Sequence, residues 1–266
     1  MRSLVEAIDR LIEANAALRK RRSLAKPERK LALAMARAFR AEERAFLSRL
    51  KEYSGRFPSE VREAEAVPWE LLFDEAAADT MNRFEAALNG PTEQALQAGM
   101  DAGAMDLAVD ATIKTSFTLK HPDAVQFIKE HGADRIKRIR QTTRDGLRSI
   151  LAQAADEGWS YDRTAEAIRK RYKHMSVERG RNIAVFELGD AYEHGNMLVG
   201  KSLQNAGLEM QKSWLTVGDS RVRPEHSANQ AQSWIPFDDA FANDGDRPPS
   251  DPRCRCTLLM RRKPDA

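Results

Sequence analysis

Four side chains in the C-terminal part of the chain are of the types that bind zinc. Cys254 and Cys256 form a C-x-C pair, and His226 and Asp219 precede them. Thiolate, imidazole and carboxylate groups are the usual ligands of Zn²⁺. Zinc sites usually have C-x-x-C or H-x-x-x-H spacing, however, and alternate residues of a strand point to opposite faces. Three interpretations therefore stay open: a structural zinc site, a disulfide, or one cysteine packed in the core with the other exposed. No other cofactor is indicated.

Glu187 is a further candidate for chemistry. It lies at helical spacing from two alanines, on a face of small residues where a buried carboxylate needs a partner. With His226 and Asp219 it would supply an acid and a base to an enzyme. We favour a structural role, because ion-pair networks commonly hold such groups. Its candidate donors are three arginines: Arg181, Arg221 and Arg223.

Two groups of basic residues have the composition of a phosphate-binding surface. The first is a run near the N-terminus: Arg19, Lys20, Arg21 and Arg22. The second is a stripe at helical spacing: Lys137, Arg140, Arg144 and Arg148. Such groups bind DNA in a salt-dependent way without reading its sequence. The alternative is a solvated helix surface or a docking patch for an acidic protein.

The charges are distributed unevenly along the 266 residues, although the formal net charge is only +3. Residues 1–53 hold 14 basic and 7 acidic side chains, whereas residues 54–112 hold 3 and 12. This asymmetry indicates surfaces that meet differently charged partners or each other. No apolar run approaches the ~20 residues needed to cross a bilayer, so we expect no membrane partner. Two cysteines are too few for a disulfide framework.

The elements that must position these residues are mostly helical up to about residue 200. Apolar residues recur at steps of three, four and seven, which is typical of helices with one buried face. Together with proline, glycine and serine signals, they predict helices over 27–53, 69–88, 122–131 and 133–157, one capped by Ser160, and one from Ser176 to about 197. Residues 92–119 form a poorly marked helical stretch.

After Gly200 the apolar period changes to two. Met210, Trp214 and Thr216 occupy even positions, which predicts a half-buried strand, and Cys254 to Met260 predict a closing strand. The expected fold class is mainly α, an elongated helical body with a small C-terminal α+β module. We place a partner-binding helical region at 1–119 and a second domain at 120–266, with helices over 122–197 and the α+β module over 205–262.

The C-terminal motifs resemble those of the phage head morphogenesis family, whose namesake is the minor head protein F of phage Mu. Residues 214–226 read WLTVGDSRVRPEH and are followed by the C-R-C of 254–256, in the order of the family's D-x-R-V-R-x-x-H and C-R-C signature. The helix containing Glu187 is similar to the family's R-x-x-I-A-x-x-E helix. The resemblance covers about residues 120–260. Its signature positions here are Glu187, Trp214, Asp219, Arg221, Arg223, His226, Cys254, Arg255 and Cys256.

The resemblance implies a non-enzymatic minor head protein of a tailed phage. Such a protein would sit in the virion head near the portal vertex, pass through the host cytoplasm during assembly, and assist head assembly, DNA packaging or DNA delivery. Its partners would be the portal protein and capsid components, with packaged double-stranded DNA as a further candidate. Two alternatives stay open: a nuclease-like or other effector enzyme using the C-terminal His/Asp/Glu/Cys cluster, and a general DNA-binding module.

Overall fold

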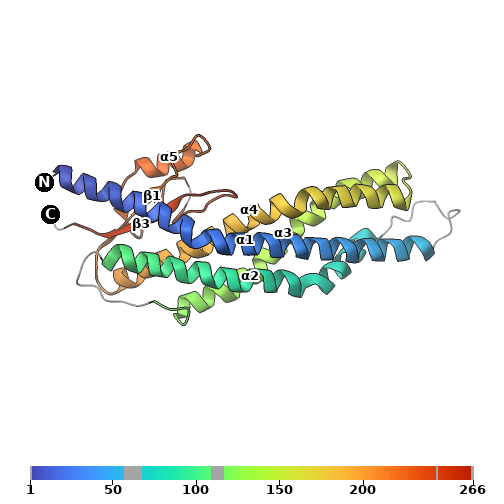
Figure 1. Ribbon diagram of the computed structural model, residues 1–266, viewed down its shortest axis with the longest axis horizontal. Helices are drawn as coiled ribbons and strands as arrows, with labels where there is room; N and C mark the ends of the chain where they lie inside the picture. The colour runs from blue at the N-terminus through green and yellow to red at the C-terminus, as the bar shows by residue number, and fades with distance from the viewer. Residues whose placement is uncertain (1, 57–67, 109–116, 244, 265–266) are drawn as a thin grey trace. The chain divides into compact units, whose positions relative to one another are not determined.

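The computed structural model of the protein describes residues 2–56, 68–108, 117–243 and 245–264 (Figure 1). Among these residues, the four long helices are α1 (Arg2–Arg56), α2 (Trp69–Ala108), α3 (Pro122–Asp156) and α4 (Tyr161–Asn205). The remaining elements are β1 (Met210–Leu215), α5 (Pro224–Ala231), β2 (Ile235–Pro236) and β3 (Thr257–Arg262). The predicted fold class, mainly α with a small C-terminal α+β module, is confirmed.

The long helices continue through positions at which we predicted ends. α1 runs through Pro27, α2 through Pro91, α3 through Gly132 and α4 through Ser176. An interior proline removes a helix hydrogen bond and costs ~3 kcal/mol. Pro27 and Pro91 are themselves buried, so packing on both sides of each proline outweighs this cost. The predicted stop at Gly158 is confirmed, since α3 ends at Asp156 and Gly158 has φ +63°.

The chain divides into two compact units, and each unit takes a part of all four long helices. The module unit consists of Met1–Lys30, Gly90–Ile128 and Asn182–Ala266. The helical unit consists of Leu31–Asn89 and Lys129–Arg181. This division does not fall at residue 119/120, because segments from both halves of the chain pack together within each unit. The domains 1–119 and 120–266 therefore stay a prediction about which segment binds a partner.

The helical unit has an aromatic core that the apolar repeats predicted. Phe39 lies edge-to-face on Phe84 with ring centroids 5.3 Å apart, and Phe46 on Phe73 at 5.8 Å. The predicted inner faces of α3 and α4 are buried here too, with fully buried side chains at Leu147, Ile168 and Tyr172. The repeats thus identified the residues that form this core, although they misplaced the helix ends.

The module unit is built around a three-stranded antiparallel sheet in the order β2-β1-β3. Both predicted strands are present, and Figure 1 shows β1 and β3 side by side near α5. The register pairs Trp214 of β1 with Leu258 of β3. Trp214 is fully buried and packs edge-to-face on Phe241, with ring centroids 5.3 Å apart. This sheet fixes the segments that contain Asp219, His226 and the cysteines.

Within the module unit, α2 and α4 pack so closely that only glycine fits at the contact. A Cβ added to Gly99 would lie 1.8 Å from the carbonyl oxygen of Tyr192. A Cβ added to Gly195 would lie 2.1 Å from the carbonyl oxygen of Leu96. The small residues of α4 that the sequence analysis noted around Glu187 thus continue into a helix–helix contact.

Candidate functional site

His226, Cys254 and Cys256 form a buried cluster in the module unit, which we call the thiol–imidazole cluster. Nδ1 of His226 lies 3.5 Å from Sγ of Cys256 and 3.8 Å from Sγ of Cys254. One ligand-type atom from each residue lies within 4.8 Å of the others. The exposed fractions are 2% for His226, 4% for Cys254 and 3% for Cys256. The interpretation with one cysteine packed and the other exposed is therefore wrong. Both thiols are free.

Both thiols reach the same histidine because the chain bends before β3 begins. Arg253 has φ +68°, in the left-handed region. The N–H of Cys254 donates to the carbonyl of Asp251 at 3.0 Å, which closes a turn. β3 starts only at Thr257. The alternation of a strand, which predicted thiols on opposite faces, therefore does not apply to this segment.

The imidazole of His226 is held from both sides. It lies in α5, which begins at Pro224 and contacts β1. On the side away from the thiols, Nε2 lies 3.0 Å from Oγ of Ser250 and 3.5 Å from a carboxylate oxygen of Asp251. Acceptors at this position favour the tautomer with its proton on Nε2 and a lone pair on Nδ1. That lone pair is directed toward the two thiols.

The two thiols differ in acidity because a hydrogen bond joins them. Hydrogen bonds from the thiol and the backbone N–H of Cys256 lower the pKa of the Cys254 thiol, against the effect of burial, and the positive charge of Lys20 adds to the lowering. The bond to Cys254 and burial raise the pKa of Cys256. Cys254 is therefore the more acidic thiol of the pair, and its thiolate accepts a hydrogen bond from the thiol of Cys256.

Asp219 lies outside the thiol–imidazole cluster. Its carboxylate accepts two hydrogen bonds from the guanidinium of Arg255, both 2.8 Å long, and a third of 3.1 Å from the backbone N–H of Arg221. The bonds from Arg255 are the main reason that the pKa of Asp219 falls to about 2. Among the described residues, Asp219 is not one of the ligand-type side chains that the structure brings together.

The two halves of the signature bind each other, and we call this arrangement the clasp. The pair of Asp219 and Arg255 forms one contact. Arg223 forms a second, since it donates to the carbonyl of Pro252 at 3.1 Å and lies 3.7 Å from the carboxylate of Asp251. The thiol–imidazole cluster forms the third. The clasp thus fastens residues 219–226 to residues 251–256.

Glu193 is a central buried carboxylate that the sequence analysis missed. It is fully buried and lies 2.7 Å from Nζ of Lys20. It also accepts hydrogen bonds from Oγ1 of Thr257 at 2.6 Å and from the N–H of Leu258 at 3.0 Å. Glu193 therefore links α1, α4 and β3. Glu187, which we had singled out, is also buried, but two of its candidate donors, Arg221 and Arg223, belong to the clasp.

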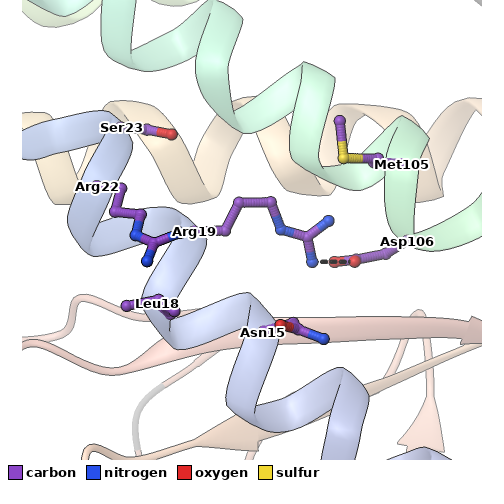
Figure 2. A pocket seen from close by; sticks show the side chains of 7 residues that line it. All are labelled: Asn15, Leu18, Arg19, Arg22, Ser23, Met105 and Asp106. Atoms are coloured by element: carbon purple, nitrogen blue, oxygen red, sulfur yellow. Dashed lines mark hydrogen bonds and ion pairs between the residues drawn. The ribbon is translucent and has the colours of Figure 1, made fainter.

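The N-terminal basic run is divided by the structure. Lys20 is buried against Glu193, so it is not available to a phosphate. Arg19 pairs with Asp106 of α2, beside a shallow groove that Leu18 and Met105 line (Figure 2). The prediction that Lys20 binds a phosphate or a partner is therefore wrong. The two residues of the run that face solvent are Arg21 and Arg22.

The basic stripe of α3 meets acidic side chains within the helical unit. Arg144 lies 3.5 Å from Asp74, and Arg148 lies 3.2 Å from Glu70. Arg140 lies 3.6 Å from the buried carboxylate of Glu42. A fourth residue, Lys137, is exposed and lies 3.3 Å from Asp134. Part of the acidic segment thus neutralises this stripe, which agrees with the alternative that the differently charged segments meet each other.

Comparison with known proteins gives one match. Residues 145–259 match the family described as Phage Mu protein F like protein. The matched segment includes Glu193 and the whole clasp, and it supports the resemblance found in the sequence. No curated protein and no solved structure matches the chain. No helix of the described residues has the length and apolar character needed to span a membrane.

Proposed function

We propose that the chain is a non-enzymatic minor head protein of a tailed phage, bound at the portal vertex. The premise is that residues 145–259 match the phage Mu protein F-like family. The family is one of head morphogenesis proteins. One observation supports the non-enzymatic part of the proposal: the polar signature residues Asp219, Arg223, His226 and Arg255 are all held by contacts within the clasp. A role in holding the domain together accounts for their residue types.

The enzyme alternative has less support from the geometry. A general acid or base must reach a substrate, whereas His226 is 2% exposed and has neighbours at both ring nitrogens. The carboxylate of Asp219 is held by Arg255. The groove of Figure 2 contains neither residue, and its polar side chains include Arg19 and Asp106, which pair with each other.

The DNA-binding alternative rests on the basic side chains that face solvent. In the N-terminal run these are Arg21 and Arg22. In the α3 stripe they are Lys137 and Arg148, each of which lies beside a carboxylate. This reduced set suits occasional phosphate contacts better than a binding surface of its own. Contact with packaged DNA is therefore a secondary part of the proposal.

The decisive experiment is to locate the protein in the phage or prophage that encodes it. Mass spectrometry of purified mature particles should find the chain in a few copies per particle, and a tagged chain should capture the portal protein from an infected lysate. A variant with three clasp changes, Asp219→Asn, Arg223→Gln and Arg255→Gln, should lose capture, whereas Arg21→Gln should keep it. A chain found only free in the lysate and absent from particles would contradict the proposal.

A further inference from the structure

The thiol–imidazole cluster has the spacing of a tetrahedral metal site. Zinc binds sulfur at about 2.3 Å and imidazole nitrogen at about 2.0–2.1 Å. In a tetrahedral site, a sulfur ligand and a nitrogen ligand therefore lie about 3.6 Å apart. The observed distances from Nδ1 of His226 to the two sulfurs, 3.5 Å and 3.8 Å, lie on either side of this value. All three ligand-type atoms lie within 4.8 Å of one another, so an ion can enter the cluster by drawing the three side chains together.

The surroundings of His226 match those of a metal-binding histidine. Such a histidine usually donates its other ring N–H to a hydroxyl, carbonyl or carboxylate, which fixes the ring and its tautomer. Here Ser250 and Asp251 occupy that position beside Nε2. The ring nitrogen without a proton then faces the sulfurs of Cys254 and Cys256. The imidazole is thus oriented before any ion arrives.

The charge and softness of the three groups select the metal. Thiolate and imidazole ligands suit zinc, whereas magnesium and calcium prefer oxygen ligands. Two thiolates and one divalent cation sum to zero charge, and a neutral set is the one that a buried position tolerates. The carbonyl oxygen of Cys256 lies near the site but accepts a hydrogen bond from the ammonium of Lys20, so it is not counted among the ligands of the ion.

We propose that His226, Cys254 and Cys256 bind one zinc ion that fastens the clasp. Among the described residues no fourth histidine, cysteine or acidic residue joins the group, so the protein supplies three ligands and the fourth position is open to a water molecule. Each cysteine loses its proton to solvent when the ion binds, and no electron is transferred. The ion would tie α5 to the segment that leads into β3. This inference does not depend on the proposed place of the protein in the virion.

The first test is the metal content of the full-length chain. The protein is purified under reducing conditions without chelator and analysed by inductively coupled plasma mass spectrometry, which should find about one zinc per chain. Cys254→Ser, Cys256→Ser and His226→Asn should each lower this value at least fivefold. Two control variants should keep the zinc: His121→Asn, which changes a histidine of the same unit, and Asp219→Asn, which changes the carboxylate outside the cluster.

A second measurement on the unchanged chain guards against variants that fail to fold. Titrating Co²⁺ into the metal-free chain should give the charge-transfer absorption of cobalt bound to thiolate and should release protons from the two thiols. The proposal is overturned if the unchanged chain holds no zinc and gives no thiolate band with cobalt. It is also overturned if zinc persists in all three ligand variants. A third contradicting result would be a disulfide between the two cysteines, seen as an intact mass two hydrogens below that of the reduced chain, in protein purified without chelator.

Discussion

At the scale of single residues, the buried ion pair of Glu193 and Lys20 contributes to the stability of the module unit. The side chain of Glu193 is fully buried and that of Lys20 is 10% exposed. Taking both charges out of water is costly, and removing one of them leaves the other buried without compensation. The hydrogen bonds from Thr257 and Leu258 satisfy the rest of the carboxylate.

We therefore predict that Glu193→Gln destabilises the protein by about 3–5 kcal/mol, the usual effect of breaking a buried pair. The double variant Glu193→Gln with Lys20→Met should regain part of this loss, because no ammonium then stays buried. Urea denaturation followed by circular dichroism measures both effects. Equal stability of Glu193→Gln and the unchanged chain would show that the pair is not formed in solution.

Glu42 gives a pH dependence whose sign follows from its surroundings in the helical unit. Burial raises the pKa of Glu42, although Arg140 and the hydroxyl of Tyr172, 3.2 Å away, act against this rise. The folded state therefore binds the proton more tightly than the unfolded state. The contribution of Glu42 to stability is full below about pH 4.3, the unfolded value, and is lost as the pH rises through the folded pKa.

The prediction is that the unfolding free energy of Glu42→Gln falls less between pH 4 and pH 8 than that of the unchanged chain, because glutamine has no proton to lose. Denaturation at a series of pH values measures the difference. Glu52→Gln, an exposed change on the same helix, is the matched control. Parallel curves for Glu42→Gln and the unchanged chain would contradict the prediction.

The convergence of the candidate site could be predicted only in part from single residues. Residue types pointed to His226, Cys254 and Cys256, because few side chains bind zinc. Their convergence depends on the left-handed conformation of Arg253. A C-x-C pattern does not predict this conformation. Glu193 went unnoticed because its cation comes from α1, and no sequence spacing relates the two residues.

At the scale of elements, the contact between α2 and α4 sets how the module unit is assembled. Gly99 and Gly195 let the two backbones touch. We predict that Gly195→Ala destabilises the protein by about 1–3 kcal/mol, because the added methyl group must push Leu96 away. Thermal unfolding measures the effect.

Gly132 provides the matched control, since it lies inside α3 and an added Cβ would meet no atom within 4 Å. Gly132→Ala should stabilise the protein by about 0.5–1 kcal/mol, the difference in helix propensity. If both substitutions shift the unfolding temperature in the same direction, the close contact between the helices does not exist in solution.

Helix faces were easier to predict than helix ends. The apolar repeats identified buried residues such as Phe39, Leu147 and Ile168, because a periodic pattern averages over many positions. A proline or glycine inside a helix costs a few kcal/mol at most, and the stabilisation from packing along a long helix is larger than this cost. Pro27, which we expected to begin a helix, and Pro91 and Gly132, which we expected to end one, therefore all lie inside helices.

At the scale of the whole molecule, the uneven charge of the sequence is largely balanced inside each unit. Asp106 pairs with Arg19 in the module unit, and Asp74 lies 3.5 Å from Arg144 in the helical unit. The pair of Arg144 and Asp74 is partly exposed and contributes little stability, whereas the pair of Arg19 and Asp106 is partly buried. Each pair neutralises one basic and one acidic side chain. The basic and acidic segments therefore say less about partners than their composition suggested.

The remaining exposed charges allow a test of DNA contact. If the chain touches DNA through its N-terminal run, changing Arg21 and Arg22 to glutamine should weaken binding and reduce the slope of log affinity against log salt by about 2, close to 0.9 per phosphate contact. Changing Arg144 and Arg148, which lie beside carboxylates, should alter the slope less. Fluorescence anisotropy with a duplex measures both, and the reverse order of effects would contradict this assignment.

The link between Lys20 and β3 has a consequence for the order of synthesis. Lys20 leaves the ribosome long before Glu193, and Glu193 long before Thr257 and Leu258, which complete its set of donors. The segment of α1 around Lys20, with its buried residues Ala16 and Leu24, therefore stays exposed to water until most of the chain has been translated. A ribosome-stalled chain that ends before residue 250 should expose this segment to proteases or chaperones, whereas the released protein should protect it.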